Sequence, residues 1–367
     1  MIIPAITVEA LPAGYGDCLL ISCPVGRRTW RLLVDTGPDE CLPILVDRLK
    51  AIPLNAQGRR RIDLAVISHV DHDHIGGAAR LFADTSLKLE SGDIWFNAPS
   101  EPATRGVREG VGPAAVLGKA SRDLPWNLAF GGQDGVTGPG LFVEMPHKRG
   151  EPRITLLSPT RRSLDDLYRV WEKELPKVKV PPEPEPLATS RSGLDVEAPA
   201  RRVTPVDRAP ANGSSIAFLL EHRGASALLT ADAFPSVLQR ALASLAASRR
   251  QPLAWKLDLF KLSHHGSRAN TKSKLLETVW APRILITTDG AIFGHPDDES
   301  IARLIASGRP SCEIWFNFRT PRTEVWADAS LQARYGYIAR LPTAARAGTT
   351  VLLSPKDPKS KTAVAGQ

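Results

Sequence analysis

Short apolar segments separated by polar turns dominate the first third of the chain. They predict four strands and one helix. The strands are expected at residues 6–11, 18–22, 30–34 and 62–68, and the helix, with apolar side chains at helical spacing, at residues 40–52. The last strand reads IDLAVIS, a continuous and β-branched pattern that is typical of a buried strand.

The same alternation returns in the second half, after a proline-dense stretch that can form neither a helix nor a central strand. Strands are expected at 215–220, 225–230, 257–263 and 283–288, and helices at 234–247 and 272–278. Alternating strands and helices predict layers of the α/β class rather than an all-β sandwich. Two near-copies of one pentapeptide, at 93–97 and 313–317, fit either an internally duplicated fold or chance.

We expect a single domain over residues 1–345, with irregular insertions near 98–150 and 176–211. Residues 346–367 are expected to form a C-terminal strand and a disordered tail. The proline-rich segment 176–211 is either a plain linker or a docking site for a protein partner.

Composition narrows the class of protein. The chain has 367 residues, of which 43% are hydrophobic and 23% charged, and this excludes collagen, coiled coils and intrinsic disorder. No apolar run approaches the roughly 18–20 residues that span a bilayer. The amino terminus lacks the basic region and the cleavage site of a signal peptide, and the four cysteines match neither a zinc ribbon nor a disulfide framework. We therefore expect a cytoplasmic protein that does not associate with membranes. The oligomeric state stays open.

The net charge is only weak evidence for a nucleic-acid partner. The chain has 47 Lys and Arg against 39 Asp and Glu, a formal charge of +8. A basic surface attracts polyanions such as nucleic acid, but scattered arginine pairs are also found on ordinary solvated faces. A nucleic-acid partner therefore needs support from the chemistry of a site.

The strongest chemical signal directly follows the strand predicted at 62–68. Residues 68–77 read SHVDHDHIGG and place five side chains able to bind a metal within six residues. In an extended segment every second side chain points the same way, so His69, Asp71 and Asp73 converge. His74 follows where the chain enters a helix. A cluster this dense predicts a metal site rather than a helix cap with solvated histidines.

Three more predicted strand ends carry matching residues. They are Asp232, the pair His264 and His265, and His295. Ligands of α/β folds gather at strand ends, so these side chains are expected to meet the first cluster in one cleft. The two remaining histidines, His147 and His222, are expected on the surface.

These motifs together resemble the metallo-β-lactamase fold hydrolases, most closely the ComEC-like branch, the domain at the end of a bacterial competence protein. The family motif is His-x-His-x-Asp-His; the chain has His69-x-Asp71-x-Asp73-His74, with the aspartate of the ComEC-like branch in second place. Further segments that resemble this branch are GYGDCLLIS, LLVDTG, NGSSIAFLLEHRGASALLTAD, LDLFKLSHHGS and GHPDDESIARL. The resemblance covers residues 1 to about 328, interrupted by 98–150 and 176–211, and implies a four-layer αβ/βα sandwich with a metal pair at one edge. The membrane channel of ComEC is absent, so DNA uptake is not implied.

The resemblance also implies roles for single residues. His69 and Asp71 would hold one divalent ion, Asp73 and His74 would hold the other, and Asp232 would bridge the two. Because these ligands include several carboxylates, Mn²⁺ competes with Zn²⁺ as the native metal.

One departure from the family pattern concerns the first metal. The usual third histidine of that site has no counterpart, because Asn212 and the pair 214–215 occupy the region. The last ligand of the set is either His265 or His295, and both stay candidates. Asp35 and Ser267 are expected to support the ligands through hydrogen bonds.

The implied reaction is hydrolysis without a covalent intermediate. Two divalent ions would activate water, Asp73 would orient it, and His264 would protonate the departing alkoxide. The leading hypothesis is a phosphodiesterase, most of all a nuclease acting on DNA. One alternative is a small-ester hydrolase of the phosphocholine esterase or lactonase type. The other is a non-catalytic metal-binding module of a larger complex, which the missing histidine motivates.

Overall fold

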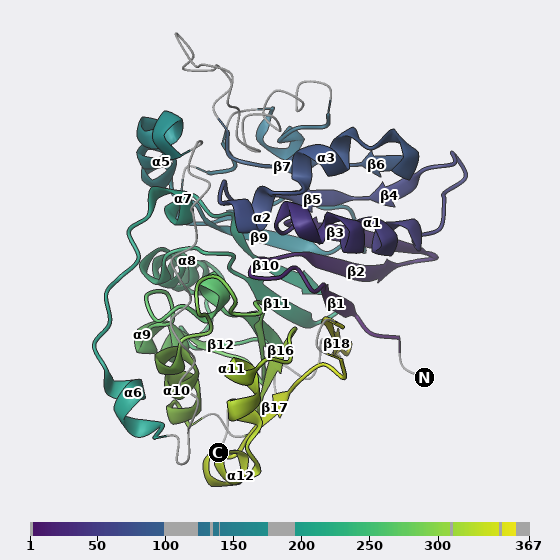
Figure 1. The fold of residues 1–367 in the computed structure, drawn as a ribbon. Helices are drawn as coiled ribbons and strands as arrows, with labels where there is room; N and C mark the ends of the chain where they lie inside the picture. Colours follow the sequence, from purple (N-terminus) through teal and green to yellow (C-terminus); the bar gives the residue numbers. More distant parts are fainter. Residues whose placement is uncertain are drawn as a thin grey trace.

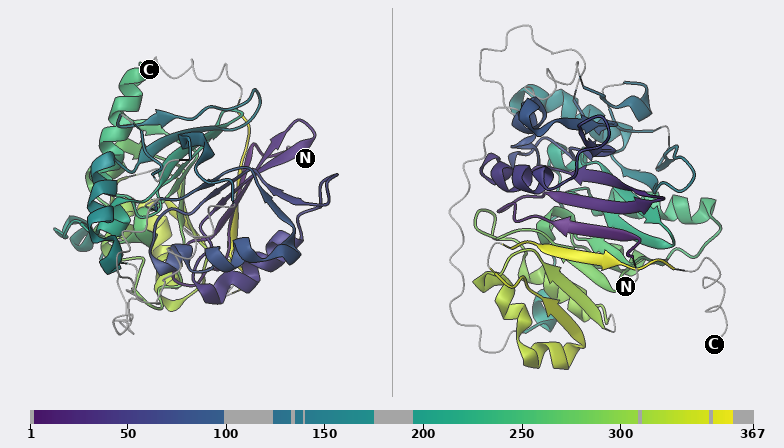
Figure 2. Two further views of the ribbon diagram at one scale, coloured as in Figure 1. Left: turned by 90° about the horizontal axis from the view of Figure 1, so that it is seen from above. Right: turned by 90° about the vertical axis from the view of Figure 1, so that its right-hand side faces the viewer.

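Two β-sheets stacked face to face form the centre of the molecule, and helices cover the outer face of each (Figures 1 and 2). The computed structural model describes residues 3–98, 124–132, 135–138, 140–174, 195–308, 311–344 and 347–356. The layers follow the order helix, sheet, sheet, helix, and the expected αβ/βα sandwich is confirmed.

The first sheet has six strands in the order β18-β1-β2-β3-β5-β7. Their bounds are β18 Thr349–Leu353, β1 Ile6–Ala10, β2 Leu19–Val25, β3 Arg28–Val34, β5 Leu64–Val66 and β7 Ile94–Trp95. β18 pairs antiparallel with β1, so the C-terminal strand completes a sheet built from the beginning of the chain, as the yellow and purple arrows of Figure 2 show. The tail predicted beyond it lies outside the described residues.

The second sheet has eight strands in the order β17-β16-β15-β13-β11-β10-β9-β8. Their bounds are β17 Tyr337–Arg340, β16 Cys312–Phe316, β15 Arg283–Ile286, β13 Leu259–Lys261, β11 Ala225–Leu229, β10 Ala217–His222, β9 Arg153–Ser158 and β8 Val143–Glu144. From β11 to β17 all neighbouring strands are parallel, so their carboxyl ends lie along one edge.

Successive side chains of a central strand pack into two different hydrophobic cores, one on each face of the sheet. On β10, Phe218 and Leu220 pack between the sheets, whereas Ala217 and Leu219 pack under the helices. Because side chains alternate across a strand, a strand covered on both faces must be apolar throughout, which explains the continuous apolar runs of the sequence. The core between the sheets fixes how their edges meet, and the functional site lies at that junction.

Helices cover both outer faces. α1 (Leu42–Lys50) and α3 (Ala78–Ala83) pack on the first sheet, and α8 (Pro235–Ser248), α9 (Ser273–Thr278) and α10 (Asp298–Ala306) pack on the second. The other helices are α2 His72–Ile75, α5 Arg161–Glu174, α6 Glu197–Arg201, α7 Pro210–Gly213, α11 Pro321–Glu324 and α12 Ala329–Tyr335. No helix in the described parts of the chain is both long and apolar enough to cross a membrane.

Two predicted strands are broken by an aspartate, in the same way. The segment 62–68 divides at Asp63 into β4 (Arg60–Ile62) and β5, and 257–263 divides near Asp258 into β12 (Trp255–Lys256) and β13. Asp63 accepts a hydrogen bond from the backbone N–H of Arg31 at 2.9 Å, and Asp258 accepts one from Ser226 at 3.0 Å. β4 then pairs with β6 (Leu89–Ser91) and β12 with β14 (Val279–Trp280), in small separate sheets.

This shared break reveals an internal duplication. In both halves an antiparallel hairpin, β2–β3 or β10–β11, is followed by a parallel strand whose sequence has the form Ile/Leu-Asp-Leu-x-x-Ile/Leu-Ser-His. The echo at 93–97 and 313–317 does not relate equivalent strands. In the order of the first sheet, β7 is the second strand after the hairpin β2–β3. In the second sheet, β16 is the third strand after the hairpin β10–β11.

Candidate metal centre

The histidines and aspartates of the motif meet where strand ends of the two sheets face each other. β5 leads into the segment 67–74, β11 leads into Asp232, and β13 leads into a single turn, η5 (Ser263–Gly266), that carries both His264 and His265. Parallel neighbours end at the same edge, so residues almost 200 positions apart in the chain come into contact.

One group of ligand atoms surrounds His74 and His265. The Nε2 atoms of these two rings lie 3.2 Å apart. A carboxylate oxygen of Asp73 lies 3.6 Å from His74 Nε2 and 3.3 Å from His265 Nε2. All three side chains are buried.

A second group surrounds His69. Its Nε2 lies 3.7 Å from Asp71 and 3.7 Å from Oδ2 of Asp232. The same Oδ2 lies 3.5 Å from Nε2 of His264, whereas Oδ1 of Asp232 faces the first group, 3.5 Å from His74 Nε2. Asp232 therefore stands between the two groups with one oxygen directed to each.

Hydrogen bonds on the far side of each ring leave lone pairs pointing inward. Nδ1 of His74 lies 2.8 Å from Asp35, and Nδ1 of His265 lies 2.7 Å from the carbonyl oxygen of Thr287. These oxygens can only accept, so both Nδ1 atoms donate and both Nε2 atoms of the neutral rings carry lone pairs. Two lone pairs at 3.2 Å cannot form a hydrogen bond with each other, but both can bind a cation between them.

Buried atoms without hydrogen-bond partners among the described residues also indicate a metal site. Among the residues that the structure describes, Nε2 of His69 and Oδ1 of Asp232 find no hydrogen-bond partner. Two ligand atoms at about 2.1 Å from a tetrahedral ion lie about 3.4 Å apart, which matches the separations within both groups. Imidazole nitrogens and carboxylate oxygens are ligands of Zn²⁺ and Mn²⁺, so the residues fit a divalent metal centre.

The local electrostatics are those of densely packed opposite charges. Burial by itself would raise the pKa of Asp73 and Asp232, but the surrounding histidines hold both carboxylate pKa values well below their usual range. Burial would likewise lower the pKa of His265, yet the carboxylates of Asp17 and Asp232 outweigh it and raise the pKa to about 9. The carboxylates thus favour any cation held here, a proton or a metal.

The backbone around the centre is unusual. Asp35, Ala231, His264 and His265 all have positive φ, between 42° and 59°. Side chains other than glycine rarely adopt this left-handed conformation, and it is maintained only where the surrounding structure enforces it. At His264 and His265 it turns two successive rings into the same centre.

Asp17 is a site residue that the sequence analysis missed. Its buried carboxylate forms an ion pair with the buried ammonium of Lys261 and accepts a hydrogen bond from the Thr287 hydroxyl. It also lies 3.3 Å from Nδ1 of His265, and the Lys261 charge helps hold the pKa of Asp17 well below its usual range despite burial. The signal was present in the GYGDC segment, but no local spacing links it to the histidines.

A second missed group surrounds the outer side of His264. Asp207 lies 3.4 Å from its Nδ1, Asn270 3.1 Å and Asn212 3.3 Å. Burial raises the pKa of Asp207 less than the contact with His264 lowers it. Asp207 lies within 176–211, so this segment contributes at least one residue to the site.

Two buried or half-buried cations fasten the part of this segment that the structure describes. Arg303 donates to the carbonyl oxygens of Ala200, Arg202, Arg268 and Thr271, and Lys272 donates to those of Thr204 and Pro205. Residues 195–209 therefore form a strap across α10 and across the HHGS loop (residues 264–267). The expectation of a plain linker does not hold for them; residues 175–194 lie outside the described residues.

The family model of the metallo-beta-lactamase superfamily matches residues 12–279. The chain belongs to this superfamily. The match identifies no particular branch within it, and no curated protein matches the chain in sequence.

The chain is also similar to solved structures at low sequence identity. The metallo-beta-lactamase fold protein YhfI from Bacillus subtilis is 12% identical, with 95% of this chain and 99% of that chain covered and a TM-score of 0.39. Zn(2+)-bound PqqB from Methylobacterium extorquens is 12% identical, with 95% and 99% covered and a TM-score of 0.44. CmlA, a diiron beta-hydroxylase from Streptomyces venezuelae, is 14% identical, with 96% and 55% covered and a TM-score of 0.37. These likenesses identify no activity.

His265 and His295, the two candidates for the last ligand, lie in different places. His265 lies inside the ligand cluster, whereas His295 lies beside His264, with ring centroids 5.3 Å apart, and its Nδ1 is 3.5 Å from Asp297. His264 stands next to His69 through their shared neighbour, Asp232 Oδ2. The hydroxyl of Ser267 accepts a hydrogen bond from the N–H of Ala269 within the loop.

Proposed function

We propose that this protein is a metal-dependent phosphodiester hydrolase that acts on DNA, in the manner of the ComEC-like domains that its motifs resemble. The observation that carries the proposal is the position of Asp232, with Oδ2 near His69 and His264 and Oδ1 near His74. A carboxylate between two ligand groups is suited to bridge two ions. Two neighbouring divalent ions act as Lewis acids, activate water and stabilise both the entering and the leaving oxygen of a phosphoryl displacement.

The chain's own residues hold and orient the participants. His69, Asp71 and His264 would hold one ion and Asp73, His74 and His265 the other, with Asp232 between them. Asp73 would also orient the attacking water. The water oxygen bonds to phosphorus as the bond to the leaving alkoxide breaks, and a proton of the water ends on that alkoxide.

A ligand role for His264 has better support than a role as the acid. Asp207 and Asn270 oxygens face its Nδ1, so Nδ1 donates and Nε2 faces Asp232 Oδ2. Burial lowers the pKa of His264, but Asp232 and Asp207 outweigh it and raise the pKa, so Nε2 favours a cation, either a proton or the metal ion that it would bind in the proton's place. His264 would then replace the missing histidine of the first site, and the first ion would have a full set of ligands.

Exposed cations near the centre favour a polyanion. Arg208 directly follows Asp207 in the strap and Arg268 directly follows the HHGS loop, and both side chains are exposed. Together with the net charge of +8, these side chains would attract the phosphates of a nucleic acid.

The alternative of a small-ester hydrolase is favoured by one observation. A cavity of about 300 Å³ lies between α5 and a wall formed by Arg208 of the strap, α7 and Phe234, and small-ligand sites begin at about that size. The two functions are distinguished by substrates: p-nitrophenyl phosphorylcholine and a lactone for the alternative, nucleic acid for the proposal.

The test is cleavage of circular single-stranded and supercoiled double-stranded DNA by chelator-stripped protein supplied with Mn²⁺ or Zn²⁺. We expect metal-dependent nicking that the Asp73→Ala, His74→Ala double variant abolishes. The exposed His147 provides a matched control, and His147→Ala should cleave like the wild type. Turnover of small esters alone would overturn the DNA substrate. Metal binding without turnover of any of these substrates would support the non-catalytic module.

A further inference from the structure

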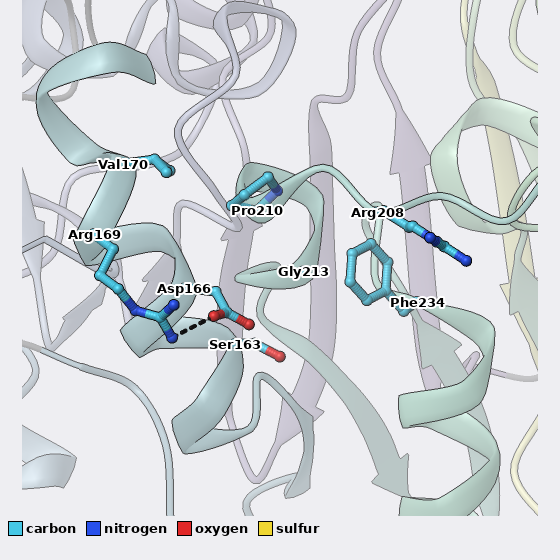
Figure 3. A pocket seen from close by; sticks show the side chains of 8 residues that line it. All are labelled: Ser163, Asp166, Arg169, Val170, Arg208, Pro210, Gly213 and Phe234. Atoms are coloured by element: carbon cyan, nitrogen blue, oxygen red, sulfur yellow. Dashed lines mark hydrogen bonds and ion pairs between the residues drawn. The ribbon is translucent and has the colours of Figure 1, made fainter.

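The cavity between α5 and the strap has a composition that suits one particular ligand. One wall is α5, which contributes Ser163, Asp166 and Arg169; the opposite wall contains Arg208, Gly213 and Phe234 (Figure 3). The figure shows Asp166 and Arg169 on one side and Phe234 and Arg208 on the other.

The cavity adjoins the metal centre through its own lining residues. Arg208 and Gly213 are the chain neighbours of Asp207 and Asn212, whose side chains are joined at 2.7 Å and both face His264. Phe234 follows Asp232 by two residues, which keeps their Cα atoms within about 7 Å of each other. The cavity therefore lies beside the residues that contact His264.

The half-buried ring of Phe234 supplies a flat apolar surface. A Cβ atom at Gly213 would lie 2.9 Å from the ring, so the glycine is needed for the ring to occupy this position. Flat ligands stack on such rings, and every nucleobase has a suitable face.

The charges of the two walls differ. Arg169 is neutralised by Asp166, at 2.6 Å, and the pair presents both donors and acceptors. Arg208 is exposed, and among the described residues no carboxylate pairs with it. An unpaired guanidinium next to an aromatic ring suits a phosphate and a base, whereas it would repel the quaternary ammonium of a choline ester.

We propose that this cavity binds the nucleoside and phosphate adjacent to the bond that is cleaved. The base stacks on Phe234, its polar edge faces Asp166 and Arg169, and Arg208 pairs with the phosphate. This inference rests on the proposed phosphodiester hydrolysis and names the part of the substrate that the site recognises.

The test compares two esters with the same leaving group, thymidine 5′-(p-nitrophenyl phosphate) and the base-free methyl p-nitrophenyl phosphate. The quantity of interest is the ratio of their kcat/KM values. Given the strength of base–aromatic stacking, Phe234→Leu should lower this ratio by about tenfold, mostly through KM, and Phe234→Tyr should retain it. A second variant, Arg208→Gln, removes the guanidinium of the cavity. Its matched control is Arg334→Gln, on α12 at the opposite end of the molecule from α5 (Figure 1).

The outcomes separate recognition from a structural effect. If Phe234→Leu lowers kcat/KM equally for both esters, or if Phe234→Tyr lowers the ratio as much as Phe234→Leu does, the cavity does not read a base and the proposal is overturned. Melting temperatures near that of the wild type exclude misfolding as the cause.

A binding measurement keeps the inference testable if neither ester is hydrolysed, a result that would count against the proposed function alone. Thymidine 5′-monophosphate is titrated calorimetrically into the Asp73→Ala, His74→Ala variant. Binding that Phe234→Leu and Arg208→Gln each weaken supports the cavity as a nucleotide site. Absence of binding, or binding that neither change affects, overturns it.

Discussion

The buried carboxylate of Asp17 joins the ammonium of Lys261 to the back of His265, with its second oxygen 3.3 Å from Nδ1 of that ring. Lys261 belongs to β13 and precedes the HHGS turn, while Asp17 belongs to the loop before β2. The pair thus connects the two sheets directly behind a metal-ligand candidate.

Breaking this pair should cost much of the protein's stability. Asp17→Asn leaves the buried ammonium of Lys261 without a carboxylate, so we expect a loss of about 3–5 kcal/mol in the free energy of unfolding. Lys261→Met should cost less, because the Asp17 carboxylate keeps its contacts with His265 and the Thr287 hydroxyl. The double variant Asp17→Asn, Lys261→Met should be more stable than the sum of the single losses predicts. Urea unfolding of the metal-free protein measures all three, and strictly additive losses would contradict a direct interaction.

Metal content should separate His265 from His295. The Nε2 of His265 lies beside ligand atoms of His74 and Asp73, whereas His295 contacts His264 and Asp297, so His265→Ala should lose at least one bound equivalent of Zn²⁺ after equilibrium dialysis. His295→Ala should keep the wild-type content. Elemental analysis by mass spectrometry provides the numbers; the reverse pattern would identify His295 as the ligand.

His264 allows a sharper distinction between ligand and acid. We expect His264→Ala to lose metal from the first site and to slow good and poor leaving groups by the same factor. An acid would behave differently, with metal content retained and a larger rate loss for the poorer leaving group, since that one depends more on protonation. Rates with a series of substituted phenyl phosphodiesters decide between the two.

His222 should make stability depend on pH. It is buried, although the sequence placed it on the surface, and its Nε2 donates to the carbonyl oxygen of Pro24 at 2.9 Å, which links β10 to β2. Burial lowers its pKa in the folded state, so the unfolded chain takes up the proton first as the pH falls below about 6.5. The stability that wild type gains over His222→Gln should shrink from pH 7.5 to 5.5. A difference that is constant or grows would be evidence against this assignment.

Arg303 should control the order of the strap. Its guanidinium is the common donor to four carbonyl oxygens of the strap and the HHGS loop, and methionine keeps the apolar stem but none of these bonds. Arg303→Met should speed amide hydrogen exchange in residues 200–206, with little change in the strands of the first sheet. Mass spectrometry of peptides from both regions measures this, and equal exchange in wild type and variant would argue that other contacts hold the strap.

Local pattern was sufficient for most of the fold. A strand covered on both faces needs apolar side chains at every position, so β10, β11 and β15 were visible as continuous runs. The interruptions at Asp63 and Asp258 were not predictable in this way. Each aspartate ends a strand only because a backbone N–H of a neighbouring strand, at Arg31 or Ser226, is available to it.

The sequence by itself determined the superfamily and most of the ligand candidates, because metal ligands cluster at short spacings that are visible without a structure. Only the tertiary structure decided which of the distant residues join them. Asp17, Asp207 and His265 come to the centre through strand pairing and through the strap, and His295 stays outside it. The physical reason is that a single polar residue carries no periodic signal; its partner depends on which strand ends the packed sheets bring together.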